Sequence, residues 1–156
     1  MADLLVKLYD IRENLGDVKK LEEAGIRVFR PMAPNRKNVL DFVAEHFGDK
    51  WAGECACAFS RSPIACYIAA KDKEIIGFAC YDATAKGFFG PIGVRKDRRA
   101  ARVGASLLRA CLLAMRQDGY GYAIIGGGHG VFAFYHKEAG AVLIEGSDPG
   151  VYADML

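Results

Sequence analysis

The segment VGASLLRACLLAMRQ, residues 103–117, limits the possible folds of this chain more than any other. Its apolar residues recur every four positions, and two leucines widen the stripe: Val103, Leu107, Leu108, Cys111, Leu112 and Met115. This spacing is typical of an amphipathic helix with one buried face. Arg102, Arg109 and Arg116 recur every seven positions, on the side predicted to face water. Gly119 is expected to end the helix, which needs another layer to cover its apolar face.

Short apolar runs bounded by turn residues predict seven strands, at residues 4–11, 26–32, 64–70, 75–82, 88–94, 122–126 and 141–145. Three more helices are predicted at residues 35–47, 50–60 and 131–139. Hairpins early in the chain and a β-α-β-α-β run late in it indicate an α/β domain with a mixed sheet. The 156 residues contain no repeat or long linker, so we expect one domain over residues 1–156.

Composition limits the function classes. No apolar run reaches the ~18 residues of a membrane span, and no signal peptide is apparent, so a cytoplasmic protein without membrane contact is expected. A net charge of +2 does not favour nucleic acid as a partner. The five cysteines are predicted to be reduced, and no metal is expected because Cys55-x-Cys57 lacks a second ligand pair.

Positive charge gathers directly before the long helix. Five residues of the segment 95–102 are basic, and the segment follows the predicted strand FFGPIGV. A helix start has unpaired backbone N–H groups and a positive dipole end, which together favour an anion. Small residues allow a ligand close to the main chain, and arginines add charge: Ala100, Ala101, Gly104 and Ala105, with Arg98, Arg99 and Arg102. This pattern predicts a pyrophosphate site.

The same stretch, VRKDRRAARVGASLL, resembles the acetyl-CoA-binding motif of the GNAT superfamily of N-acetyltransferases, Gln/Arg-x-x-Gly-x-Gly/Ala. Arg99 takes the Gln/Arg place, Gly104 takes the final small place, and Val94 matches the valine that ends the preceding strand. Arg102 stands where the first glycine is usual. Its side chain must therefore point away from the pyrophosphate or wrap its guanidinium around it.

A second segment, FAFYHKEAGA, resembles the late helix-turn-strand region of the same family. Tyr135 falls where many members keep a tyrosine close to the cofactor sulfur. The extra residue before Gly140, and Ala141 in place of an aromatic residue, depart from the family pattern. The two motifs together cover about residues 75–145.

The resemblance implies a mixed, mostly antiparallel sheet of about seven strands flanked by about four helices. A splayed parallel pair, the strand ending at Val94 and the strand at residues 122–126, would bind acetyl-CoA. Main-chain groups of Ile92, Gly93 and Val94 would pair with the pantetheine arm. The pyrophosphate would contact Arg99, Ala100, Ala101, Arg102, Val103, Gly104 and Ala105.

The family's chemistry is direct attack of a primary amine on the thioester of acetyl-CoA. An amide near Val94 would stabilise the oxyanion, and Tyr135 would protonate the leaving thiolate. The base stays open among Asp82, Glu45, His129 and a water chain. A non-catalytic acyl-CoA-binding module is the alternative, because the strand at residues 88–94 has no carboxylate and Arg102 departs from the motif.

The acceptor is not identified by the sequence. The residues Glu45, Asp49, Lys50, Trp51 and Glu54 form a mildly acidic, partly aromatic set that suits a cationic small-molecule or peptide amine. The segment GGGHGVFA also fits a loose dinucleotide fingerprint, although too little chain follows it for such a sheet. Whether the C-terminal tail closes over the substrate or packs in a homodimer is left open.

Overall fold

The computed structural model describes residues 1–98 and 102–156. Its sheet has the strand order β2-β3-β4-β5-β6-β1-β7. The strands are β1 (Leu4–Lys7), β2 (Ile26–Phe29), β3 (Cys66–Lys71), β4 (Glu74–Tyr81), β5 (Phe88–Val94), β6 (Tyr122–Ile125) and β7 (Val142–Leu143). Pairing is antiparallel throughout the described sheet except between β5 and β6, which run parallel. The predicted mixed, mostly antiparallel sheet is confirmed.

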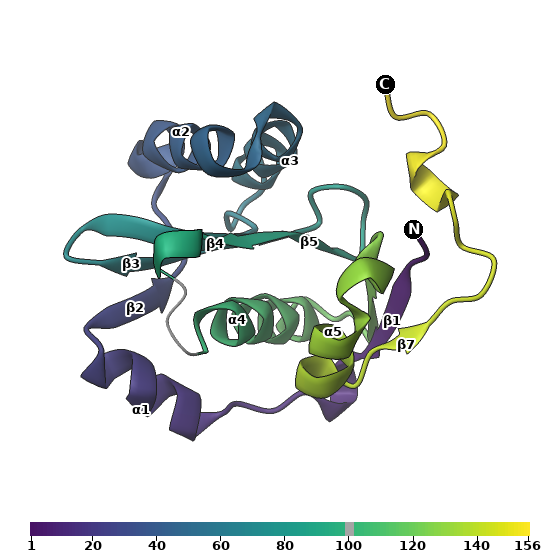
Figure 1. The fold of residues 1–156 in the computed structure, drawn as a ribbon, viewed down its shortest axis with the longest axis horizontal. Helices are drawn as coiled ribbons and strands as arrows, with labels where there is room; N and C mark the ends of the chain where they lie inside the picture. The colour runs from purple at the N-terminus through teal and green to yellow at the C-terminus, as the bar shows by residue number, and fades with distance from the viewer. Residues whose placement is uncertain (99–101) are drawn as a thin grey trace.

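Helices cover both faces of this sheet. They are α1 (Leu15–Glu23), α2 (Arg36–Phe47), α3 (Asp49–Phe59), α4 (Val103–Gln117) and α5 (Phe132–Ala139). Figure 1 shows α2 and α3 on one face, and α4 with α1 on the other. The apolar stripe of α4 is buried as its period predicts, with Leu107, Cys111 and Met115 fully covered by the strands. No helix in the described ranges is long and apolar enough to cross a membrane.

Two N-terminal elements differ from the sequence prediction. The first strand ends at Lys7, and Leu8–Asp10 form a 3-10 turn that buries both Leu8 and Ile11. Helix α1 was not predicted, so the described helices number five rather than about four. Its sequence, LGDVKKLEE, buries one apolar side chain, Leu21, which leaves almost no hydrophobic period to detect.

The strands β5 and β6 separate soon after they pair. Their pairing covers two positions, Phe88 with Ile124 and Phe89 with Ile125. Directly afterwards the register between β4 and β5 shifts, so that two β5 residues, Gly90 and Pro91, lie opposite one residue of β4. Gly90 has a φ of 117° and Pro91 has no backbone N–H, both of which favour such a bulge. Beyond it, β5 continues to Val94 beside β4 alone, which leaves its other edge open.

Candidate functional site

A cleft of about 1880 Å³ opens where β5 and β6 separate. Its floor is formed by β5 from Phe89 to Val94, and one wall is formed by the glycines 126–128 that follow β6. Gly104 of α4 and Tyr135 of α5 reach the cleft from one side of the sheet. The α2–α3 corner lines it from the other side, through Glu45, Phe47, Trp51 and Glu54.

The open edge of β5 forms the floor of this cleft. Ile92, Gly93 and Val94 all line it, and they extend past the last residue paired with β6. An unpaired strand edge offers N–H and C=O groups to an extended ligand. Gly93 must be bare here, because an added Cβ would lie 2.6 Å from atoms of the Phe47 ring. That ring stacks on Trp51, with centroids 5.6 Å apart, so the α2–α3 corner covers the floor closely.

The N-terminus of α4 lies at one end of the floor. Val103 and Ala105 bury their side chains, so only their backbone can reach a ligand. Gly104 lines the cleft, and an added Cβ would come no closer than 3.8 Å to Phe134 and 3.9 Å to Val94. The first N–H groups of a helix have no partner within the helix, so they are available to an anion. The predicted contacts Arg99, Ala100 and Ala101 lie outside the described residues.

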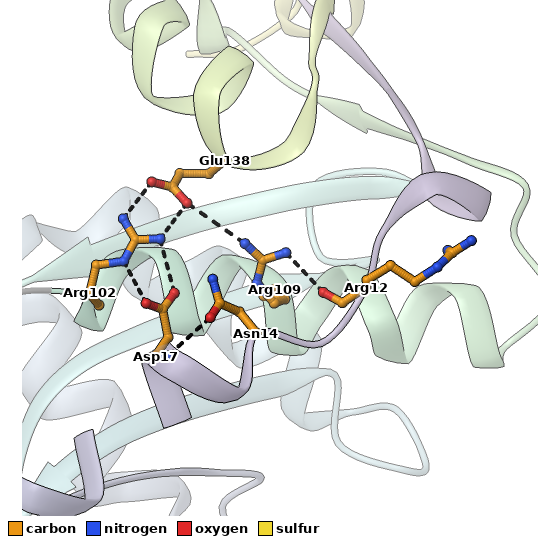
Figure 2. Close-up of polar contacts among 6 residues, drawn as sticks. All are labelled: Arg12, Asn14, Asp17, Arg102, Arg109 and Glu138. Atoms are coloured by element: carbon orange, nitrogen blue, oxygen red, sulfur yellow. Dashed lines mark hydrogen bonds and ion pairs between the residues drawn. The ribbon is translucent and has the colours of Figure 1, made fainter. Parts of the chain in front are cut away.

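The side chain of Arg102 points away from the cleft. Figure 2 shows its guanidinium between Asp17 of α1 and Glu138 of α5. Two N–H groups donate to Asp17 at 2.9 Å each, and two donate to Glu138 at 2.6 Å each. Of the two orientations that the sequence left open, the structure has the one directed away from the anion site. Arg102 can therefore contribute its backbone there, but not its charge.

Both carboxylates of this cluster are nearly inaccessible, with 8% of the Asp17 side chain and 6% of the Glu138 side chain exposed. The hydrogen bonds from Arg102 lower the pKa of Asp17 and that of Glu138. The same hydrogen bonds, first the one to Glu138 and then the one to Asp17, raise the pKa of Arg102. The cluster is thus fully ionised at neutral pH and joins α1, α4 and α5 by charge.

The prediction that the arginine stripe of α4 faces water is wrong for Arg102 and Arg109, whereas Arg116 is exposed. Arg109 is 18% exposed and lies 3.7 Å from Glu138, and it donates to the carbonyl of Arg12 at 3.0 Å. Arg116 donates to the carbonyl of Ile11 at 2.8 Å. These arginines hold the segment between β1 and α1 against α4, as Figure 2 shows for Arg109. The ion pairs of Asp17 and Glu138 with these arginines could not be predicted from the sequence, because the partners are distant in the chain.

Other charges of the basic segment are also paired. Arg95 donates to Asp97 at 2.6 Å and also contacts Glu74, which Arg98 approaches at 3.4 Å. The segment 95–102 therefore presents less free positive charge than its composition suggests. The anion-binding features left at the cleft are Lys96, which lines it and has no ion pair among the described residues, and the backbone of the α4 N-terminus.

Tyr135 lines the cleft from the first turns of α5. Its ring packs edge-on against Phe89, with centroids 6.2 Å apart, and its side chain is 6% exposed. Burial raises the pKa of Tyr135 to about 12. Its hydroxyl has no hydrogen-bond partner among the described residues. The phenol is therefore protonated and free to donate to a ligand.

The candidate bases are separated by the structure. Asp82 lies outside the cleft lining, and its buried carboxylate accepts from the Tyr120 hydroxyl at 3.0 Å and from the Gly87 amide at 2.7 Å. His129 is exposed and also lies outside the lining. Glu45 and Glu54 do line the cleft, and Glu54 accepts a hydrogen bond from the Thr84 hydroxyl at 2.6 Å. Carboxylates line the cleft from α2 and α3, and also through Asp97 and Asp148, but not from β5.

The C-terminal tail also reaches the cleft. Tyr152 is part of the lining, and an added Cβ at Gly126 would collide with its hydroxyl. Of the two roles left open for the tail, closure over the cleft matches this position. Gly126 to Gly128 also line the cleft, so the glycine-rich segment shapes its wall.

A splayed parallel pair, an open strand edge and a helix N-terminus together match the arrangement that the two motifs implied. The family model described as "Acetyltransferase (GNAT) family" matches residues 30–141. The chain belongs to this family. No curated protein matches the sequence closely enough to count as a relative.

Solved structures agree with this GNAT fold. The glucosamine N-acetyltransferase region of a fungal multi-domain β-N-acetylglucosaminidase aligns with a TM-score of 0.72 at 11% identity, over 92% of this chain and 19% of that one. A GCN5-related N-acetyltransferase from Sphaerobacter thermophilus aligns with a TM-score of 0.62 at 17% identity, over 92% and 48%. One from Kribbella flavida aligns with a TM-score of 0.55 at 18% identity, over 81% and 48%. This chain therefore spans about a fifth to a half of these chains, and at such identities the likeness shows the fold alone.

Proposed function

We propose that residues 1–156 act as one domain that transfers the acetyl group of acetyl-CoA to an amine. The observation that carries this proposal is the open edge of β5 at Ile92–Val94, which leads through the cleft to the N-terminus of α4. Membership of the GNAT family supports it. The cleft is long and large enough for an extended ligand with an anionic end.

The residues present fit acetyl-CoA. Its pantetheine arm is an extended chain of amides, which can hydrogen-bond to the unpaired edge of β5 as an added strand does. Gly93 leaves room for that arm beneath Phe47. Its diphosphate would lie against the backbone N–H groups of Val103, Gly104 and Ala105, where the dipole of α4 favours negative charge. Arg99 to Arg102, which the motif assigns to the pyrophosphate, are proposed to contact it as well.

The proposed reaction is direct acyl transfer. The amine nitrogen attacks the thioester carbonyl, a C–N bond forms, and the C–S bond breaks with the electron pair leaving on sulfur. A backbone N–H near Val94 stabilises the oxyanion, because a donor fixed in advance needs no reorganisation. Tyr135 hydrogen-bonds to the departing sulfur through its protonated, unoccupied hydroxyl and is proposed to pass it a proton, which the phenol regains from solvent.

The acceptor is proposed to be a cationic amine, either a small molecule or a peptide. Glu45, Glu54 and Trp51 line the cleft beyond the reacting end of β5, and carboxylates beside an aromatic ring favour an ammonium group. Of the side chains considered as bases, Glu45 lines the cleft, and it is proposed to receive the amine proton directly or through water. Glu54 already accepts a hydrogen bond from Thr84, which fixes its orientation.

The test is release of free coenzyme A thiol when the protein and acetyl-CoA are offered separate amines. The panel contains a polyamine, a lysine-containing peptide, a peptide with a free N-terminus, an aminoglycoside and glucosamine. Thiol release that depends on one class of amine supports transfer and identifies the acceptor class. Acetyl-CoA binding without release for any amine supports the non-catalytic module instead, for which Arg102 in place of the motif glycine argues. Absence of binding contradicts both.

A further inference from the structure

Three cysteine sulfurs meet in the core, away from the cleft. Cys55 lies on α3, Cys66 on β3 and Cys80 on β4, and their sulfur atoms all lie within 4.8 Å of one another. Each of the three side chains is completely buried, and none lines the cleft. The spacing in sequence does not reveal this group, because its members come from three separate elements.

The sheet itself fixes two of the three positions. Cys66 and Cys80 are directly opposite partners in the antiparallel pairing of β3 with β4. The Tyr81 amide donates to the Ala65 carbonyl at 3.0 Å, so the hydrogen bonds flank the cysteine pair rather than join it. Side chains approach most closely at such a non-hydrogen-bonded pair. Helix α3 then places Cys55 beside them.

The three sulfurs have the spacing of a metal site. With metal–sulfur bonds of about 2.3 Å, three sulfurs in a trigonal plane stand roughly 4.0 Å apart. Sulfurs already within 4.8 Å reach that spacing by small side-chain rotations. Thiolates are soft ligands that select Cu(I) and Zn(II). Zn(II) prefers four ligands. In the described part of the chain this group offers three sulfur ligands, and their burial leaves no place for a water as the fourth, which favours Cu(I).

The burial of the site also favours a monovalent ion. All three side chains are completely buried, so any charge left unbalanced among them would be costly. A monovalent ion is neutralised by a single thiolate, whereas a divalent ion needs two deprotonated thiols.

We propose that Cys55, Cys66 and Cys80 form a three-sulfur binding site for Cu(I). This site is separate from the acetyl-transfer cleft and does not depend on the proposed function. The ion would join α3 to β3 and β4, and it would stabilise the folded protein because the unfolded chain does not hold the three sulfurs together.

The test is an anaerobic titration of the reduced protein with Cu(I), supplied through a coloured competing chelator. Incubation continues until the chelator signal is constant, since an ion enters a buried site through local opening. The expected result is transfer of one ion per chain, three sulfur neighbours in X-ray absorption, and a rise in Tm. Transfer of no ion, or an ion with two sulfur neighbours, overturns the proposal.

Matched variants show which thiols hold the ion. Cys57 is exposed on the same helix, so Cys57→Ser should leave the titration unchanged, as should Cys111→Ala elsewhere in the core. Cys55→Ala, Cys66→Ala and Cys80→Ala should each weaken binding at least tenfold. Circular dichroism checks that each variant is folded. If a variant does not fold, the number of sulfur neighbours in X-ray absorption of the unaltered protein decides whether the site exists. Uptake abolished by Cys57→Ser contradicts the site.

Discussion

Arg102 combines an unfavourable backbone conformation with a favourable side-chain position. Its φ of 77° lies in the left-handed region, which costs a residue with a side chain about 1 kcal/mol. Its guanidinium offsets this cost through four hydrogen bonds to two buried carboxylates. Arg102, which stands where the family motif has its first glycine, therefore holds a left-handed conformation by charge. Charged pairs of this kind cannot be read from a sequence, because Asp17 lies 85 positions away.

Substitutions at Arg102 separate these two contributions. Arg102→Ala leaves Asp17 and Glu138 without their partner and keeps the unfavourable φ, so we expect it to lower the free energy of unfolding by about 3 kcal/mol. Arg102→Gly loses the same hydrogen bonds but removes the backbone cost, and should be about 1 kcal/mol more stable than the alanine variant. Urea unfolding measures both. Equal stability of the two variants would show that the φ of this residue carries no cost.

Tyr135 can be tested by removing one oxygen. Tyr135→Phe keeps the ring that packs on Phe89 and removes the proton donor. We expect acetyl-CoA binding to stay within about twofold and turnover to fall about a hundredfold. The panel that identifies an acceptor supplies the rate measurement. Unchanged turnover would remove the acid role, while loss of binding as well would indicate that the hydroxyl positions the cofactor.

At the scale of elements, the hydrophobic period of α4 and the short apolar runs of the middle strands were sufficient to predict their positions. The missing element, α1, lacks that period and is held by capping and charge: the Asn14 side chain accepts from the Asp17 amide at 3.0 Å, and Asp17 bonds Arg102. The bulge at Gly90 and Pro91 was also not predicted. Gly90 and Pro91 favour a bulge, but its position in the register depends on the pairing with β4, which the sequence of one strand does not contain.

The contact between α4 and β4 is tight enough to exclude one methyl group. At Gly77 an added Cβ would lie 3.0 Å from Leu107 and 3.1 Å from the Gly93 carbonyl. Gly77→Ala should therefore destabilise the protein by about 1–3 kcal/mol through overpacking. Gly53→Ala is the control, since nothing lies within 4 Å of its Cβ on α3 and alanine favours a helix by about 1 kcal/mol. The Tm of Gly77→Ala should fall and that of Gly53→Ala should rise. A shift of both Tm values in one direction would contradict the packing described.

The attachment of α1 should also weaken in acid. Arg102 lowers the pKa values of Asp17 and Glu138 below their ordinary values of 3.8 and 4.5. A carboxyl with a lowered pKa stabilises the fold above its ordinary pKa, and that contribution is lost as pH falls through the folded value. Urea unfolding between about pH 5 and 3 should show falling stability, less steeply in Asp17→Asn. Parallel curves would show that Asp17 contributes nothing to acid sensitivity.

For the whole molecule, two short motifs were enough to identify the family and its sheet, because they lie at the strand and helix ends where the cofactor is expected to bind. The surfaces proposed to choose the acceptor assemble from distant parts of the chain. Glu45 and Glu54 reach the cleft from α2 and α3, and Tyr152 reaches it from the C-terminal tail. No local spacing connects these residues, so the sequence indicated their charge without their arrangement.

The central claim is that the N-terminus of α4 receives the diphosphate of acetyl-CoA, and Gly104 tests it most directly. Gly104→Glu places a negative charge in the cleft at the first turn of α4, where it favours the helix but repels an anion. Gly104→Ala is the matched control, since its methyl group would have only ordinary contacts, the nearest at 3.8 Å. The measurement is the change in Tm on adding acetyl-CoA at about a hundred times its Kd, where bound ligand stabilises by about 2.7 kcal/mol. The account predicts that Gly104→Glu without ligand is as stable as the unaltered protein. Its Tm should not change on adding acetyl-CoA, whereas the Tm of Gly104→Ala should rise as much as that of the unaltered protein. An undiminished rise in Tm in Gly104→Glu would contradict the account.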